Sequence, residues 1–201
     1  MLQYQGKSII EYWRLKKIAK QVRAGIIPKG VDGDRVLEAM KLTKPKSVVE
    51  MLGLTYAQVF HPDGTLKKDY GLVSAKLVTT VFVQRLVDAL ITSGDVIDNF
   101  NQHKMGAGST AESAGQTALV TQQVGAQAAT GNASATHGAS SHIYRTVGTL
   151  TAGSAYGCRE HGVFNASTGG ILLDRSVVTN IDLNTDDIVT WTYELTVNPG
   201  G

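Results

Sequence analysis

Residues 160–177 have the sequence EHGVFNASTGGILLDRSV, and residues 180–201 continue with NIDLNTDDIVTWTYELTVNPGG. Together they predict two or three strands joined by glycine turns. The apolar residues recur largely at period two, which lets one face of each strand pack inward: Val163, Ile171, Leu173, Val177, Ile181, Ile188, Trp191, Tyr193, Leu195 and Val197. The pattern places Trp191 in the core and Thr192 on the opposite face.

The rest of the chain extends this pattern upstream. Pro62-Asp63-Gly64 predicts a tight turn between strands at 54–61 and 65–73, since proline presets its dihedral angle and glycine accepts a positive φ. Further strands are expected at 96–105, 117–124, 143–151 and 155–165, with a helix near 76–92. We therefore predict a mainly β protein, with a β-sandwich or jelly-roll-like body, an N-terminal α-helical arm and one further helix.

The first fifty residues differ from the rest in charge and pattern. They carry eleven Lys or Arg against five Asp or Glu, a net of +6, whereas residues 51–201 carry eight against twelve, a net of −4. Ser8 and Glu11 fit a capping box, followed by a helix over 9–24. Short helices are expected at 35–40 and 47–54. We divide the chain into a basic helical attachment arm, 1–53, and a β-rich sandwich domain, 54–201.

Several motifs in the C-terminal half occur in a recognisable order. NQHKMGAGSTAESAGQTALVTQ follows Phe100, IYRTVGTLT starts at Ile143, and then come EHG, TGG, LLDR and a final PGG. This series resembles a family of small structural proteins of tailed bacteriophages. The resemblance covers roughly the C-terminal half and leaves the first fifty residues outside. It implies a virion structural protein without fixing its place in the particle.

Residues that favour chemistry occur in four places, and each has a structural interpretation. His137 and His142 are five residues apart in a Gly/Ser segment without a further ligand, so we expect no metal site. In a strand, Cys158 and Glu160 would share one face and His161 the other, which disfavours a Cys-His nucleophile pair and favours a buried thiol.

Two more patterns also favour a structural role over chemistry. Gly106-Ala-Gly108 lacks the lysine of a phosphate loop, so it predicts a tight connection. Asp182, Asp186, Asp187 and Glu160 would be candidates for paired catalytic carboxylates, but residues 184–187 predict a turn, where aspartate is common. Asp174-Arg175 predicts a structural ion pair with a neighbouring strand. We therefore expect a non-enzymatic protein with no catalytic residue, no cofactor and no metal.

Composition also limits where the protein is made and what it contacts. The single cysteine cannot form an internal disulfide, no apolar run reaches the length of a membrane span, and residues 7–23 are too charged for a signal peptide. We expect synthesis in a bacterial cytoplasm, a final location on the capsid surface of a virion, and no membrane partner. No nucleic-acid-binding motif accompanies the basic arm, so nucleic acid is disfavoured as a partner.

The leading hypothesis is a capsid decoration or cement protein. It would stabilise the head shell through contacts with the major capsid protein and with neighbouring copies of itself, and family analogy suggests a trimer. The arm would make these contacts through one set of residues: Ile9, Tyr12, Trp13, Lys16, Lys17, Lys20 and Arg23. A solvated helix face is the alternative interpretation of that set. A tail, baseplate or fibre component is the alternative function, and a carbohydrate-binding β-sandwich is a further one.

Overall fold

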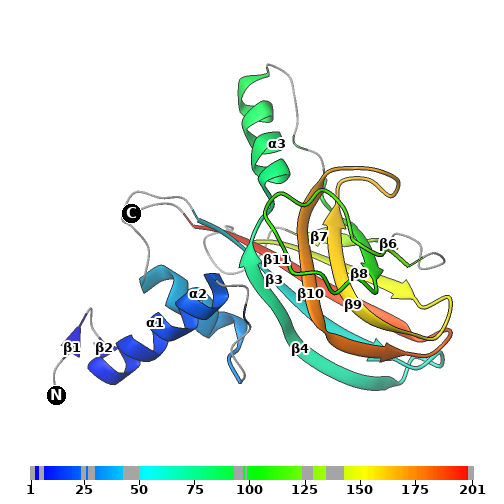
Figure 1. Ribbon diagram of the computed structural model, residues 1–201, viewed down its shortest axis with the longest axis horizontal. Coiled ribbons are helices and arrows are strands. Elements are labelled where there is room, and N and C mark those ends of the chain that lie inside the picture. The colour runs from blue at the N-terminus through cyan, green and yellow to red at the C-terminus, as the bar shows by residue number, and fades with distance from the viewer. Residues whose placement is uncertain are drawn as a thin grey trace.

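The computed structural model describes residues 3–4, 7–23, 26, 30–42, 50–92, 97, 99–123, 129–134 and 143–198 of the 201-residue chain. Two antiparallel sheets pack face to face as a sandwich, with two helices beside one sheet and a third projecting from one end (Figure 1). The predicted class, mainly β with an N-terminal helical part and one further helix, is confirmed.

The larger sheet has five strands in the order β4-β3-β11-β8-β7. Their bounds are β3 Glu50–Phe60, β4 Leu66–Leu77, β7 Asn132–Ser134, β8 Ile143–Thr151 and β11 Ile188–Asn198. β3 and β4 form the predicted hairpin, and Gly64 takes the positive φ of 82° that its turn requires. β11 lies between β3 and β8 and pairs with both.

The smaller sheet has the order β10-β9-β5-β6. Its strands are β5 Gln102–Gly106, β6 Ala129–Thr130, β9 Tyr156–Phe164 and β10 Leu172–Leu183. β9 and β10 are the hairpin expected from EHG to LLDR. A separate two-stranded sheet, β1 (Gln3–Tyr4) and β2 (Lys7–Ser8), precedes the first helix.

The interior between the sheets follows the predicted alternation from Trp191 to Leu195, but not at the end of β11, where Thr196 is buried and Val197 is 38% exposed. Trp191 and Tyr193 are fully buried, whereas Thr192 is half-buried on the outer face. Two apolar clusters fill this interior; the larger one contains Met105, Cys158, Ile181 and Trp191. Thr55 and Ser176 add a hydrogen bond between the sheets, with 3.0 Å between their hydroxyl oxygens.

The first two helices, α1 (Ile9–Arg23) and α2 (Gly33–Leu42), cover part of the outer face of the large sheet. Leu15, Ile18, Ala19 and Val22 of α1 join a third apolar cluster with Leu52, Leu54 and Ala75 of the hairpin. Gly33 suits this contact because a Cβ there would lie 2.2 Å from the Tyr56 hydroxyl. The helices therefore share a core with β3 and β4.

The helix expected at 47–54 is wrong over the residues that the structure describes, since Glu50 to Leu54 open β3 and residues 43–49 lie outside the description. Leu52 and Leu54 are two residues apart and both face α1 and α2. The expected boundary between residues 53 and 54 consequently falls inside β3.

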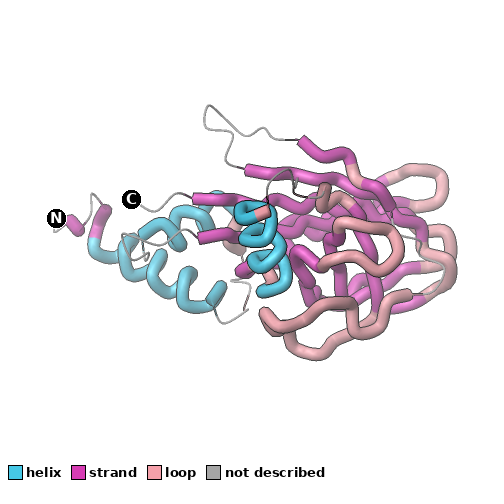
Figure 2. The backbone as a smooth tube through the Cα atoms, turned by 90° about the horizontal axis from the view of Figure 1, so that it is seen from above, coloured by secondary structure: helices cyan, strands magenta, loops and turns pink. Residues whose placement is uncertain are grey.

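Helix α3, Thr80–Ile91, is the helix expected near 76–92. The Thr79 hydroxyl caps its N-terminus by accepting from Phe82 N at 3.3 Å and itself donates to Leu172 O at 2.5 Å. Phe82 is the buried residue of the helix and packs edge-on against Phe100. Seen from above, α3 is nearly end-on, so it projects away from the sandwich (Figure 2).

The strand expected at 117–124 is wrong for residues 117–123, and Val124 lies outside the description. Residues 107–123 form an irregular loop with one isolated bridge, between Gly106 and Gln122. The reason lies in the smaller sheet, where a buried carboxylate takes the amides that a strand would have donated to a neighbour.

Candidate functional site

That carboxylate is Glu160 of β9, which is fully buried and anchors the loop 107–123. It accepts from the amides of Gly108 at 3.1 Å, Val120 at 3.0 Å and Thr121 at 2.6 Å. The Arg175 Nε of β10 donates to it at 2.7 Å, and both side chains are at most 1% exposed. Burial opposes ionisation, but the amides of Thr121 and Val120 and the guanidinium of Arg175 outweigh it, so the pKa of Glu160 is lowered.

Arg175 and Glu112 complete the attachment of the loop. Arg175 Nη1 donates to Thr110 O at 3.1 Å and to Gln116 Oε1 at 3.2 Å. Glu112 accepts from the Val177 amide and pairs with Lys76. Glu112, Glu160 and Arg175 come from the TAE, EHG and LLDR motifs. Three of the sequence motifs thus meet at the loop 107–123, and we call Glu112, Glu160 and Arg175 the loop clamp. The predicted ion pair of Asp174-Arg175 with a neighbouring strand is confirmed for Arg175.

A second polar group lies between the sheets and includes His103 and His161. His103 Nδ1 is 3.0 Å from His161 Nε2, and His103 Nε2 is 3.1 Å from the Thr146 hydroxyl. The His161 ring stacks on Trp191 with centroids 4.4 Å apart. Burial lowers the pKa of His103 to about 4 and, with the neighbouring imidazole, that of His161 well below its usual value. Two neutral imidazoles therefore fill a core position.

This pair corrects the expected alternation in β9. Cys158 belongs to the apolar cluster around Trp191, and His161 also faces Trp191, whereas Glu160 faces the loop. The strand pairing is irregular here, since Val177 pairs with Glu160 but Ile181 pairs with Cys158. Cys158 is fully buried, which confirms the expected buried thiol, and burial raises the pKa of this thiol to about 12.

The other candidates for chemistry remain apart. His137 and His142 lie outside the described residues. Asp187 accepts from Asn184 N at 2.7 Å and pairs with Lys67 at 2.5 Å, while Glu160 belongs to the loop clamp. Within the described ranges, no three His, Cys, Asp or Glu side chains gather as metal ligands.

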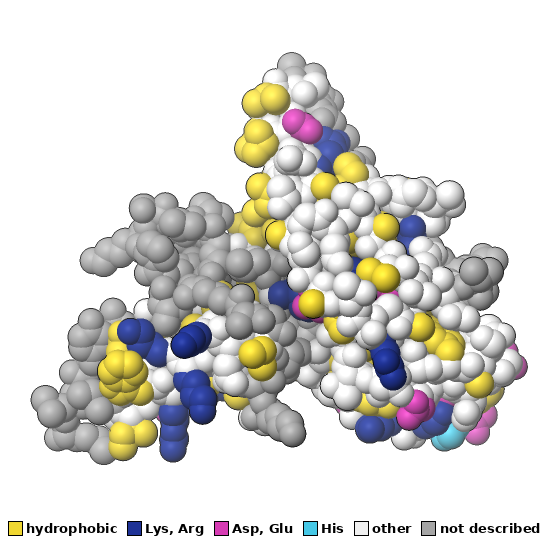
Figure 3. Space-filling view, viewed as in Figure 1, with side chains coloured by type: hydrophobic (Ala, Val, Ile, Leu, Met, Phe, Trp, Pro, Cys, Tyr) yellow, Lys and Arg dark blue, Asp and Glu magenta, His cyan; other side chains and the backbone are white. Residues whose placement is uncertain are grey.

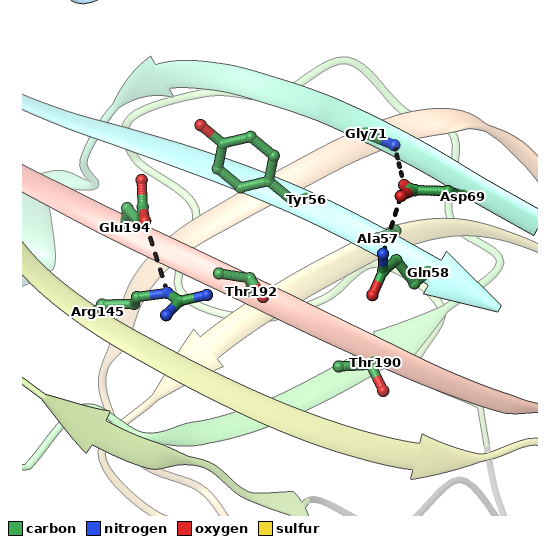
Figure 4. Close-up of a pocket in the computed structure, with 9 residues that line it drawn as sticks. All are labelled: Tyr56, Ala57, Gln58, Asp69, Gly71, Arg145, Thr190, Thr192 and Glu194. Carbon is green, nitrogen blue, oxygen red and sulfur yellow. Dashed lines mark hydrogen bonds and ion pairs between the residues drawn. The ribbon is translucent and has the colours of Figure 1, made fainter. Parts of the chain in front are cut away.

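A shallow groove lies on the part of the large sheet's outer face that the helices leave open (Figure 4). It measures about 290 Å³ and is lined by side chains of four strands: Tyr56, Gln58, Asp69, Arg145, Thr190, Thr192 and Glu194. Arg145 and Glu194 pair across it at 3.5 Å, and Gln58 donates to Asp69 at 2.8 Å. Burial raises the pKa of Tyr56 to about 12, so its hydroxyl stays protonated. No sequence pattern indicates this groove, because its residues come from four separate strands.

The predicted arm residues divide between two faces of α1. Trp13 is 62% exposed, and Lys16, Lys17 and Lys20 are exposed beside it, whereas Tyr12 is half-buried. Lys16 Nζ lies 5.3 Å from the Trp13 ring centroid, a cation–π contact. The side chains of Ile9 and Arg23 lie outside the description. Ile10, which the prediction omitted, is 59% exposed and one helical turn from Trp13. Figure 3 shows hydrophobic and basic side chains together on this part of the surface.

A second exposed apolar surface runs along α3. Val83, Val87, Leu90 and Ile91 are 37%, 50%, 81% and 75% exposed, and Figure 3 shows hydrophobic side chains along one edge of the projecting helix. The sequence placed α3 correctly, but helical periodicity alone cannot distinguish an apolar stripe that packs inward from one that remains uncovered.

Comparisons of the chain with models of protein families, with curated proteins and with solved structures gave no match. The described helices include none that is both long and apolar enough to span a lipid bilayer.

Proposed function

We propose that this protein is a structural component of a tailed-bacteriophage virion and that it acts as a capsid decoration or cement protein. The outer face of α1 carries the proposal: Trp13 and Ile10 are exposed among lysines, a combination that suits a protein contact. The resemblance of the C-terminal motifs to phage structural proteins supplies the setting.

The geometry of the loop clamp favours assembly over catalysis. Glu160 and Arg175 are buried against each other and against backbone groups of the loop, which gives them no access to a substrate. The clamp holds the irregular loop 107–123 against the smaller sheet through these hydrogen bonds. Many copies on a shell then add weak contacts into strong attachment.

The proposed partners are the major capsid protein and neighbouring copies of this chain, with a trimer as the assembly suggested by analogy. Synthesis in the host cytoplasm and a final place on the capsid surface complete the proposal. A tail, baseplate or fibre component remains the alternative within the same class.

Copy number separates these two places. Quantitative mass spectrometry of purified particles of the encoding phage, normalised to the major capsid protein, should give a number comparable to that of the shell subunits. A value of a few copies per particle would move the protein to the tail, and its absence from particles would end the proposal.

The attachment face is tested by Trp13→Ala, with Leu66→Ala as a matched control because Leu66 is an exposed apolar residue on the hairpin. Loss of a Trp anchor should weaken binding to particles by about 2 kcal/mol or more. The control should bind like the wild type. Equal binding by both variants would remove α1 as the attachment element.

The groove in Figure 4 favours one further candidate, a carbohydrate-binding sandwich. A tyrosine and several hydrogen-bonding side chains line an open sheet face there, which suits a sugar ring. Titration with oligosaccharides from the host surface, comparing wild type with Tyr56→Ala, tests this role, and an absence of binding to either protein would exclude it.

A further inference from the structure

The stripe on α3 is a surface that neither the resemblance nor the sequence patterns assigned. Val83, Val87, Leu90 and Ile91 recur at intervals of four, three and one, so they lie on one side of the helix. Leu86 is half-buried at the border of the stripe and packs against the cluster around Phe82. The stripe thus begins at the sandwich and extends to the far end of α3.

The apolar stripe of α3 needs a partner surface that removes it from water. α3 is 12 residues long, and isolated helices of that length are marginal in water, so tertiary packing must supply most of their stability. Among its described residues, only Phe82 is classed as buried. The last two turns therefore leave large apolar side chains in solvent, an arrangement that favours association.

The distribution of charge on α3 indicates which partner covers its apolar stripe. At about 100° per residue, Arg85 lies roughly 120° or more around the helix from every residue of the stripe. Asp88 lies roughly 100° from Val87 and 60° from Ile91, so it borders the stripe, and the stripe itself consists of uncharged side chains. An uncharged face matches another uncharged face without placing like charges opposite each other. The α1 face differs, because its exposed lysines would repel the same face of a second copy. Self-contact therefore fits α3 and does not fit α1.

We propose that α3 is a self-association surface that pairs with α3 of a second copy of this chain. The helix projects from the sandwich, so another copy can approach along its length (Figure 1). A single 12-residue helix offers less than the roughly 800 Å² per partner of a standard stable interface, so the association should depend on concentration. It would be one of the contacts between copies in the proposed particle, yet purified protein alone tests it, so each proposal can fail without the other.

The first experiment is sedimentation velocity across a wide range of protein concentration, on the wild type, Val87→Asp and Leu90→Asp. A control, Leu66→Asp, places the same charge on a leucine that is 54% exposed in the hairpin. The average mass of the wild type and of the control should rise with concentration. The helix variants should associate at least about tenfold more weakly than the wild type. A wild type that stays monomeric throughout, or helix variants that associate like the wild type, would overturn the proposal.

A disulfide experiment does not depend on how a variant tolerates an added charge. The native Cys158 is fully buried, so it gives no background in mild oxidation. Val87→Cys or Leu90→Cys should form covalent dimers faster than Leu66→Cys at equal concentration. Equal rates at the helix and hairpin positions would show that α3 has no preference for another copy and would overturn the proposal.

Discussion

Among the described residues, Trp191 has the largest fully buried side chain, and its ring stacks on His161. Thr192, the next residue along β11, faces the groove on the outside of the same sheet. These neighbours therefore experience opposite environments, which makes them a matched pair for testing the core.

Trp191→Ala should lower the free energy of unfolding by about 3 to 5 kcal/mol, because it removes a large packed surface and leaves a cavity. Thr192→Ala should change it by about 0.5 kcal/mol or less, as is usual for positions outside the core. Denaturant melts of the two variants give the comparison, and equal midpoints would mean that the register of β11 is mistaken.

His103 makes stability depend on pH. Its pKa in the folded protein is about 4, while an unfolded chain has about 6.5. As the pH falls from about 6.5 to about 4, the unfolded state takes up a proton that the folded state excludes. Protonation of this residue should therefore lower the free energy of unfolding by about 3 kcal/mol. Asp174 acts in the opposite sense, since burial raises its pKa to about 6 despite Lys76, and the folded state takes up that proton first.

The contribution of His103 can therefore be measured as the difference in pH dependence between the wild type and a variant without this imidazole. Unfolding free energies of wild type and His103→Gln, measured between pH 7 and pH 4.5, should diverge because the variant loses less stability on acidification. Parallel curves would show that the imidazole is not held neutral by the core. The sequence alone could not reveal this pair, since its members are 58 residues apart and meet only when β5 pairs with β9.

Among elements, the loop 107–123 depends on one carboxylate. Glu160→Gln would keep the shape of the side chain but leave the guanidinium of Arg175 buried without its counter-charge. We expect a loss of about 3 to 5 kcal/mol, the range for breaking a buried pair, and faster proteolytic cleavage within the loop.

The control is Glu194→Gln, which removes the partner of Arg145 on a more open face. This pair is partly exposed, at 41% for Arg145 and 17% for Glu194. Pairs near the surface contribute about 0 to 1 kcal/mol, so this variant should melt close to the wild type. Similar losses in both variants would contradict the assignment of Glu160 as the anchor of the loop.

Sequence patterns predicted β8 well, because its apolar residues alternate. They also located the β9–β10 hairpin from its glycine turn, although the alternation expected within β9 is wrong. Thr117–Val124 failed because its amides satisfy a distant side chain, which leaves no trace in local pattern. For 47–54, the period-two spacing of Leu52 and Leu54 was present, but both faces of β3 are covered and its apolar run resembles a short buried helix.

At the scale of the molecule, α1 and α2 belong to the same packed unit as the hairpin. An N-terminal truncation that starts at Leu54 would remove the first residues of β3 and uncover Tyr56, Leu72 and Ala75. We expect such a protein to aggregate or to melt well below the full chain, as light scattering and circular dichroism would detect. A soluble fragment with an unchanged melting temperature would show that the helices form an independent arm.

The central position of β11 has a kinetic consequence. β11 joins β3 to β8, and its pairing brings Asn198 to Glu50 across most of the chain. Closure of so long a loop is slow, and β-rich proteins dominated by distant pairings fold in milliseconds to seconds. Until β11 arrives, β3 and β8 each present an open edge on which other chains can add. Recovery on refolding should therefore fall as the protein concentration rises, and the rate-limiting step should be sensitive to changes in β11.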